Sequence, residues 1–247
     1  MAPVRWGRRP EASAAAATTL PRTAIQLTDV AHSYGNRPVL TDVSMTLTER
    51  RVGVIGANGS GKSTFARLLN GLVVPAEGTV TVDGFDTRIQ GREVRRRVGF
   101  VFQDPDAQIV HPTVEEDLGF GPHNQGLPAE ETARRVEDVL VRYGLTEHRD
   151  HPAHLLSGGQ KQLLAIAGVL VMEPMRIVFD EPTTLLDLAN TRRVSRVIDE
   201  LEQDVVVVTH HLDLLDGFER VLVFEDGRVV ADGSPGETVP WYVARTG

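Results

Sequence analysis

Cysteine is absent from the 247 residues of this chain. The absence excludes disulfide bonds, thiolate metal sites and a cysteine nucleophile, and it fits a reducing compartment. An apolar run of about 20 residues, the length that crosses a bilayer, is also absent. The longest candidate covers only residues 163–172. A role at a membrane would therefore depend on a membrane-embedded partner.

Basic residues are fewer than acidic ones, 26 against 34, which leaves a net charge of −8. A chain with this negative charge has no basic surface for nucleic acid, and we expect no nucleic-acid partner. Residues 1–22 differ, with four arginines against one glutamate. No secretory apolar segment follows this basic start. We expect a disordered tail there, or an upstream start codon wrongly chosen.

The segment from Gly56 to Thr64 reads GANGSGKST and fits the phosphate-binding loop G-x-x-x-x-G-K-[ST]. A buried-strand pattern precedes it and a helix pattern follows it, which is the context the motif requires. Backbone N–H groups and the helix N-terminus would face phosphate oxygens. Lys62 would reach the β- and γ-phosphates, and the Ser63 hydroxyl would ligate Mg²⁺. The predicted nucleotide-binding residues of this loop are Gly56, Asn58, Gly59, Ser60, Gly61, Lys62, Ser63 and Thr64.

Period-two alternation across residues 24–50, interrupted by a turn at 33–38, predicts an antiparallel hairpin region before the phosphate loop. Tyr34 lies in this turn with an aromatic face free to stack on a base. Asp226-Gly227 predicts a second hairpin. Three short apolar runs, at 98–103, 177–181 and 205–210, read as buried strands of a parallel sheet.

A helical region interrupts these strands over about residues 104–165. Thr113 and Glu116 form a capping-box pattern, and we expect Gly119, Gly121 and Pro122 to end the helix that it starts. Residues 128–143 are amphipathic, with Gly144 as a C-terminal cap. A further helix is expected over residues 188–203, with its apolar face inward.

Taken in order, the phosphate loop, Gln103, the LSGGQ segment at 156–160, the Asp180-Glu181 pair and His210 resemble the ATP-binding-cassette (ABC) transporter ATPases. The resemblance covers roughly residues 24–235. It implies an α/β P-loop NTPase fold with a RecA-like core, an N-terminal antiparallel β subdomain and a helical insertion. The expected ATPase domain is 23–240, with a short C-terminal tail at 241–247.

The resemblance also assigns roles. Glu181 is similar to the family's general base, Asp180 would hold the Mg²⁺ shell, and Gln103 would touch Mg²⁺ or the attacking water. His210 matches the histidine that contacts the γ-phosphate, with the adjacent His211 as the alternative. The expected activity is hydrolysis of ATP, with ATP and Mg²⁺ bound.

In this family the LSGGQ segment contacts the ATP of the opposite subunit. We therefore expect Ser157, Gly158, Gly159 and Gln160 to bind ATP across a homodimer, and Asp187 to lie at the dimer interface. Both halves of the composite site are intact in this sequence, although a heterodimer remains an alternative. Three histidines at 148, 151 and 154 admit a metal site, but Pro152 breaks any helix there and favours loop histidines.

The run from Phe102 to Ile109, FQDPDAQI, resembles the energy-coupling-factor (ECF) group. In that group a short helix, here about 106–119, lines the groove for a transmembrane coupling subunit. The resemblance implies a peripheral protein on the cytoplasmic face of the membrane that also works with a substrate-binding membrane subunit. Leu163 departs from the group's arginine, which puts a salt bridge at that position in doubt.

The imported substrate implied by the resemblance is a vitamin. The absence of a C-terminal helical extension favours the dedicated biotin transporters, with cobalt or nickel import as the alternative. A conventional ABC transporter, a soluble ABC ATPase acting on ribosomes or DNA, and a non-catalytic cassette are the other interpretations. The intact Glu181 and His210 disfavour the last of these.

Overall fold

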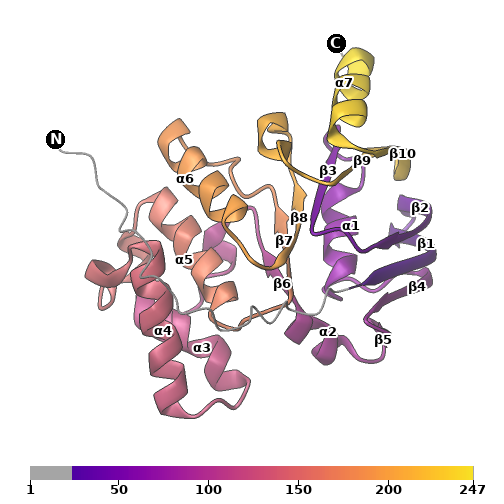
Figure 1. Cartoon of the computed structure of the whole chain (residues 1–247). Helices are drawn as coiled ribbons and strands as arrows, with labels where there is room; N and C mark the ends of the chain where they lie inside the picture. The colour runs from indigo at the N-terminus through magenta and orange to yellow at the C-terminus, as the bar shows by residue number, and fades with distance from the viewer. Residues whose placement is uncertain (1–23, 247) are drawn as a thin grey trace, which may run out of the picture.

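The computed structural model describes residues 24–246, so the tail predicted at residues 1–22 lies outside the described part of the chain. Two sheets form its centre, an antiparallel one in the order β2-β1-β4-β5 and a six-stranded one in the order β10-β9-β3-β8-β7-β6 (Figure 1). The strands are β1 (Ile25–Tyr34), β2 (Arg37–Leu47), β3 (Arg51–Gly56), β4 (Glu77–Val82), β5 (Phe85–Asp86), β6 (Val98–Val101), β7 (Arg176–Asp180), β8 (Asp204–Val208), β9 (Arg220–Glu225) and β10 (Arg228–Gly233).

Helices cover both faces of the six-stranded sheet. In Figure 1, α3 to α6 lie on one side, and α1 lies on the other side with the antiparallel sheet. Within residues 24–246, no helix has the length and apolar character that a membrane crossing requires. The helices are α1 (Lys62–Leu69), α2 (Gly91–Arg97), α3 (Val114–Asn124), α4 (Ala129–Tyr143), α5 (Gly158–Leu170), α6 (Leu188–Asp199) and α7 (Pro235–Thr246), with short 3₁₀ turns η1 (Pro105–Ala107), η2 (Thr146–His148), η3 (Ala153–Leu155) and η4 (Leu212–Leu215).

The strands β6, β7, β8, β3 and β9 run parallel, and only the edge strand β10 is antiparallel to its neighbour. Alternate residues of β8 enter two separate cores. Val205 and Val207 belong to the core that includes residues of α3 to α6, whereas Val206 and Val208 belong to the core that includes residues of α1 and the antiparallel sheet. A strand covered on both faces has to be apolar throughout, as the sequence pattern indicated. The predicted α/β fold, with an antiparallel N-terminal part and helical elements, is confirmed.

Local sequence signals placed several element ends correctly. The capping box at Thr113 and Glu116 starts α3, and Gly144 ends α4 in the left-handed conformation with φ of 67°. Asp226 and Gly227 both have positive φ, which a tight hairpin between β9 and β10 requires. The domain boundary predicted at residue 240 falls inside α7.

Three helix predictions were wrong. The chain does not form one helix over 106–119, because η1 ends at Ala107 and α3 starts only at Val114. Gly119, Gly121 and Pro122 do not end α3, which continues to Asn124. Leu118 and Pro122 are both buried, and this burial offsets the lost backbone hydrogen bond. The helix expected over 188–203 ends at Asp199.

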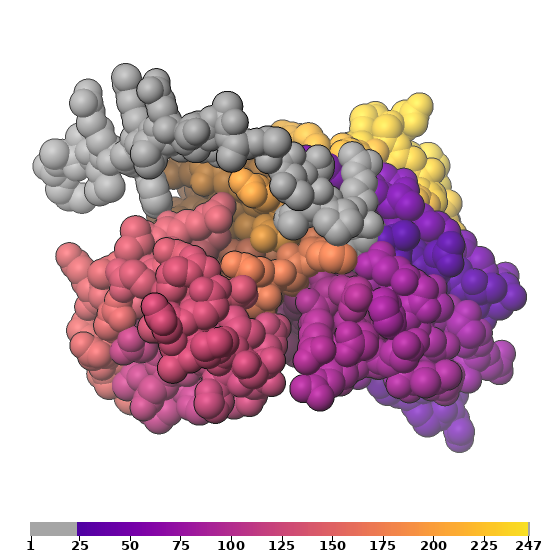
Figure 2. All heavy atoms as spheres, turned by 60° about the horizontal axis from the view of Figure 1, so that its bottom comes forward, coloured from indigo at the N-terminus to yellow at the C-terminus, as the bar shows by residue number. Residues whose placement is uncertain are grey.

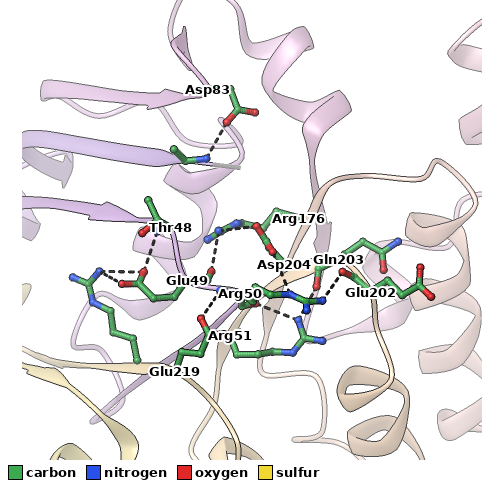
Figure 3. A network of polar contacts seen from close by, with 12 residues as sticks. Thr48, Glu49, Arg50, Arg51, Asp83, Arg176, Glu202, Gln203, Asp204 and Glu219 are labelled. Atoms are coloured by element: carbon green, nitrogen blue, oxygen red, sulfur yellow. Dashed lines mark hydrogen bonds and ion pairs between the residues drawn. The ribbon is translucent and has the colours of Figure 1, made fainter. Parts of the chain in front are cut away.

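At the amino ends of the strands, a polar network joins the two sheets (Figure 3). Arg176 is fully buried at the start of β7, and its Nη2 donates to Asp204 Oδ2 at 3.2 Å and to the carbonyl oxygen of Glu49 at 3.0 Å. Glu49 lies in the turn between β2 and β3. Burial lowers the pKa of Arg176, and the charge of Asp204 opposes that shift. The pair therefore fixes the position of the antiparallel sheet relative to β7 and β8.

Replacing Asp204 with alanine should destabilise the protein by about 3–5 kcal/mol, because it removes the carboxylate that offsets the buried charge of Arg176. Urea unfolding followed by circular dichroism measures this loss. The control is Asp213→Ala, which removes the same charge from an exposed side chain and should change stability by less than about 0.5 kcal/mol. Equal midpoints for the two variants would show that the pair does not stabilise the sheet junction.

Candidate active site at the ends of the parallel strands

A cavity of about 700 Å³ opens where β3, β6, β7 and β8 end. Parallel strands present their carboxyl ends at one edge of a sheet, so residues far apart in sequence meet there. Of the predicted site residues, the cavity is lined by Asn58, Gly59, Gly61, Lys62, Ser63, Thr64, Gln103, Glu181 and His210. The structure thus gathers the phosphate loop and three distant polar side chains around one cavity.

The phosphate loop has a shape that only glycine allows at two positions. Gly56 has φ of 144°, and a Cβ there would overlap the carbonyl oxygen of Phe224. Gly61 has φ of 104° and caps the start of α1. Lys62 Nζ donates to the carbonyl oxygens of Gly56 and Ala57, both at 2.8 Å. Burial lowers the pKa of the Lys62 ammonium, and the nearby carboxylates of Glu181 and Asp180 oppose this shift.

Asp180 and Ser63 form a ready set of oxygen ligands. The Ser63 hydroxyl donates to Asp180 Oδ1 at 2.9 Å, and Asp180 is 2% exposed. Burial raises the pKa of Asp180, whereas the Ser63 hydrogen bond and Arg67 lower it. Among residues 24–246, no cluster of three or more His, Cys, Asp or Glu side chains could hold a metal alone. The donor set fits Mg²⁺, which usually takes one or two carboxylates together with substrate phosphates.

Glu181 is held in a fixed orientation beside His210. Its φ is 55°, a conformation that costs free energy for a residue with a side chain, and its N–H donates to the carbonyl of Val208 at 2.9 Å. Glu181 Oε2 accepts from the Thr184 hydroxyl at 2.8 Å and lies 2.5 Å from His210 Nδ1. Glu181 is 9% exposed and lines the cavity.

Three lining residues were not predicted from the sequence. Arg37 and Val39 reach the cavity from β2, and Thr184 reaches it from the turn after β7. Arg37 starts β2 just after the turn at Gly35 and Asn36, but its approach to the phosphate loop depends on how the two sheets pack. Thr184 sits three residues after Glu181, a spacing that allows the observed hydrogen bond and could have suggested it.

The LSGGQ segment lies elsewhere. None of the residues from Ser157 to Gln160 lines the 700 Å³ cavity. Ser157 caps α5, its N–H donates to Gln160 Oε1 at 2.8 Å, and Gln160 Nε2 lies 2.8 Å from His148 Nε2. Gly159 is buried, and a Cβ at this position would overlap the side chain of Asn190 on α6.

Other predicted residues take the following positions. Tyr34 is half exposed at the end of β1, with its ring edge against His32, and does not line the cavity. His211 lies 3.5 Å from the Thr183 hydroxyl, so His210 is the histidine that faces the cavity. Leu163 is 1% exposed in the core. The Asp187 side chain caps α6 by accepting from the Asn190 N–H at 2.8 Å.

A separate groove of about 410 Å³ runs between α2 and α3. Figure 2 shows the hollow between the lobe that contains α3 and α4 and the lobe that contains α2. One wall is basic, with Arg92, Arg95 and Arg96, and the opposite wall contains Phe120, which is 43% exposed. Within the same groove lie Val110, Asp117 and Met172.

Comparison with known proteins agrees with this geometry. The family model described as ABC transporter matches residues 40–184. A Deinococcus radiodurans protein named "Putative ABC transporter ATP-binding protein" is 62% identical over 221 residues, which cover 90% of this chain and 98% of that protein. The biotin transport ATP-binding protein BioM of Rhizobium etli is 45% identical over 218 residues, covering 88% of this chain and 97% of that protein.

Among solved structures, CbiO1 of Clostridium perfringens, described as part of the ABC transporter complex cbiONQ, superimposes with a TM-score of 0.78. It is 33% identical, and the match covers 91% of this chain and 94% of that chain. The family model includes the phosphate loop, Gln103, the LSGGQ segment and the Asp180-Glu181 pair within its span. This chain belongs to the ABC transporter family and is an ATPase of that family.

Proposed function

We propose that the chain is the ATPase of an ECF-type importer and that it hydrolyses ATP between two copies of itself. The observation that carries the two-copy proposal is the separation of the site into two surfaces. The phosphate loop, Glu181 and His210 share one cavity, whereas the cap of α5 at Ser157 lies outside it. A helix N-terminus favours an anion, so the α5 cap of one copy suits the phosphates bound by the other.

The predicted site residues then have roles in nucleotide binding and phosphoryl transfer. Lys62 and the backbone N–H groups of the loop neutralise the phosphate charge. Ser63, Asp180 and Gln103 would hold Mg²⁺, which when bound offsets the negative charge of the phosphates. Glu181, oriented by Thr184 and His210, accepts the proton of the attacking water. Tyr34 would stack on the base from the end of β1.

The groove between α2 and α3 suits a segment of a transmembrane coupling subunit. Its exposed apolar side chains, Val110 and Phe120, would be buried by such a segment. The arginines of α2 would pair with acidic groups of the partner. Such a partner would place the chain on the cytoplasmic face of the membrane, beside a substrate-binding membrane subunit. The name of the Rhizobium etli relative supports biotin as the imported vitamin. Cobalt or nickel import is the second candidate.

Replacing Glu181 with glutamine should lower the ATP hydrolysis rate by about 10²–10⁴-fold, because the amide cannot accept the proton. The variant keeps the shape of the side chain, so ATP binding and ATP-dependent dimerisation should persist. Phosphate release measures the rate, and light scattering measures dimerisation. Near-normal turnover would contradict the general-base role.

Two inactive variants should recover activity when mixed, if each site combines two copies. Lys62→Ala disables the phosphate loop of its own copy, and Ser157→Arg blocks the α5 cap. Half of randomly mixed dimers contain one of each, and each mixed dimer holds one intact site, so roughly a quarter of the parental rate should return. A mixture as inactive as its components would overturn the two-copy site.

Replacing Phe120 with aspartate should remove the membrane partner without affecting ATP binding, because the new charge would be buried in the groove contact. Affinity purification from detergent-solubilised membranes, followed by mass spectrometry, identifies the partners. The control is Val141→Asp on α4, which is 63% exposed and outside the groove. We expect the Val141→Asp control to recover a coupling subunit and a substrate-binding subunit. The Phe120→Asp variant should recover neither of them. A permease with a solute-binding protein instead would exclude the ECF type.

A further inference from the structure

Two histidines in the segment before α5 lie in direct contact. The turn η2 ends at His148, and the His151 N–H donates to the carbonyl oxygen of His148 at 2.9 Å. This turn places the two imidazoles beside each other, with Nδ1 of His148 2.8 Å from Nδ1 of His151. The third histidine of the segment, His154, lies exposed on η3. The structure therefore forms a pair of imidazoles where the sequence shows three histidines.

A chain of hydrogen bonds joins this pair to the start of α5, and its direction is fixed. The backbone N–H of Ser157 can only donate, so the Gln160 atom that lies 2.8 Å from it has to be the amide oxygen. The NH₂ group of Gln160 then faces His148 Nε2 at 2.8 Å, and this nitrogen has to accept. A neutral His148 consequently has its proton on Nδ1 and donates it to His151 Nδ1.

The separation of the two Nδ1 atoms suits one metal ion bound to both. If metal–nitrogen bonds are about 2.0–2.1 Å long, as for zinc, two such ligands are about 2.9 Å apart at a right angle and about 3.3 Å apart at the tetrahedral angle. The observed 2.8 Å is close to the right-angle value. Nitrogen ligands at right angles are typical of tetragonal Cu²⁺ and Ni²⁺. A small rotation of the exposed His151 ring would direct both lone pairs at the ion.

The charges around the pair permit a cation. Arg149 lies between the two histidines in the sequence, but it is paired with Glu115 at 2.8 Å and with Glu137. Glu147 and Asp150 are exposed and add negative charge to the same segment. Within the part of the chain that the structure describes, no third His, Cys, Asp or Glu side chain completes the group. Water molecules would therefore fill the remaining coordination positions.

We propose that His148 and His151 bind a divalent transition metal ion, Cu²⁺ or Ni²⁺ in class, and that the bound ion weakens the cap of α5. The ion takes the lone pairs of both Nδ1 atoms, and the proton of His148 moves from Nδ1 to Nε2. The new N–H group then faces the NH₂ group of Gln160, so two donors meet. Gln160 can accept from His148 only by turning its oxygen away from the Ser157 N–H.

One of the two Gln160 contacts is therefore lost whenever the ion is bound. The site itself requires neither a nucleotide nor a second copy. Its effect on assembly rests on the proposed function, in which Ser157 meets the nucleotide of the second copy. There the bound ion would disfavour closure of the two copies around ATP.

Copper binding to the full chain, prepared without an affinity tag, tests the site. At one equivalent of Cu²⁺, electron paramagnetic resonance should show hyperfine splitting from two imidazole nitrogens. His151→Ala should remove this splitting and lower the Cu²⁺ affinity in a calorimetric titration by about 10–100-fold, at least the cost of losing an outer-shell partner. His151 is exposed, so its removal leaves no cavity in a core. The control is His154→Ala, which removes an exposed histidine of the same segment and should change neither quantity.

Gln160→Glu tests the connection to α5. A carboxylate accepts from both the Ser157 N–H and the His148 Nε2–H, and it strengthens a metal-bound imidazole. This variant should bind Cu²⁺ about tenfold more tightly than the parent. Hydrogen exchange followed by mass spectrometry, without nucleotide, then reports on the peptide that contains Ser157. Cu²⁺ should accelerate its exchange about two- to tenfold in the parent, the worth of one hydrogen bond, and should not accelerate it in Gln160→Glu.

The site is overturned if the parent shows fewer than two nitrogens, if the splitting persists in His151→Ala, or if it disappears in His154→Ala. The connection to α5 is overturned if Cu²⁺ leaves exchange at Ser157 unchanged in the parent, or if Gln160→Glu binds Cu²⁺ no more tightly. Because these measurements use no nucleotide, their failure leaves the proposed function as it stands. Failure of the two-copy site, shown by inactive mixtures of Lys62→Ala and Ser157→Arg, would equally leave the metal site as it stands.

Discussion

A parallel sheet buried on both faces is the constraint on which the rest of this structure depends. Because both faces are covered, polar side chains can leave the sheet only at its ends. The carboxyl ends of β3, β6, β7 and β8 therefore carry the phosphate loop, Gln103, Glu181 and the approach to His210. The order of the strands places these groups around one cavity, although they lie far apart in the sequence.

The amino ends of the same strands carry a polar network that stabilises the fold. There Arg176 and Asp204 are buried among strand ends and hold the antiparallel sheet through the backbone at Glu49. A buried ion pair is costly to form and more costly to break, so it specifies one arrangement of the two sheets. Arg37 and Val39 reach the phosphate loop from β2, so their position depends on how the two sheets are arranged. The geometry of the site thus depends on a network at the far end of the sheet.

Short-range signals explain most of what could be predicted from the sequence. The phosphate loop, the cap at Thr113, the hairpin at Asp226-Gly227 and the buried strands each depend on neighbours in the chain, which the sequence displays directly. The end of α3 was missed because tertiary burial of Pro122 outweighs its poor helix propensity. The approach of Arg37 to the phosphate loop and the contact of Gln108 with the carbonyl oxygen of Ala165 are set by packing between distant elements. No local pattern encodes a hydrogen bond from Gln108 to Ala165, 57 residues away.

The close packing of Gly159 against Asn190 has a consequence for assembly. A side chain at position 159 would drive α5 and α6 apart, so the two helix starts are held as one rigid unit. Ser157 caps the first of these helices and Asp187 caps the second. Their separation is set before any partner arrives. Under the two-copy proposal, a second copy that binds this face would meet a preorganised epitope, and little conformational entropy would be lost when the two copies close around a nucleotide.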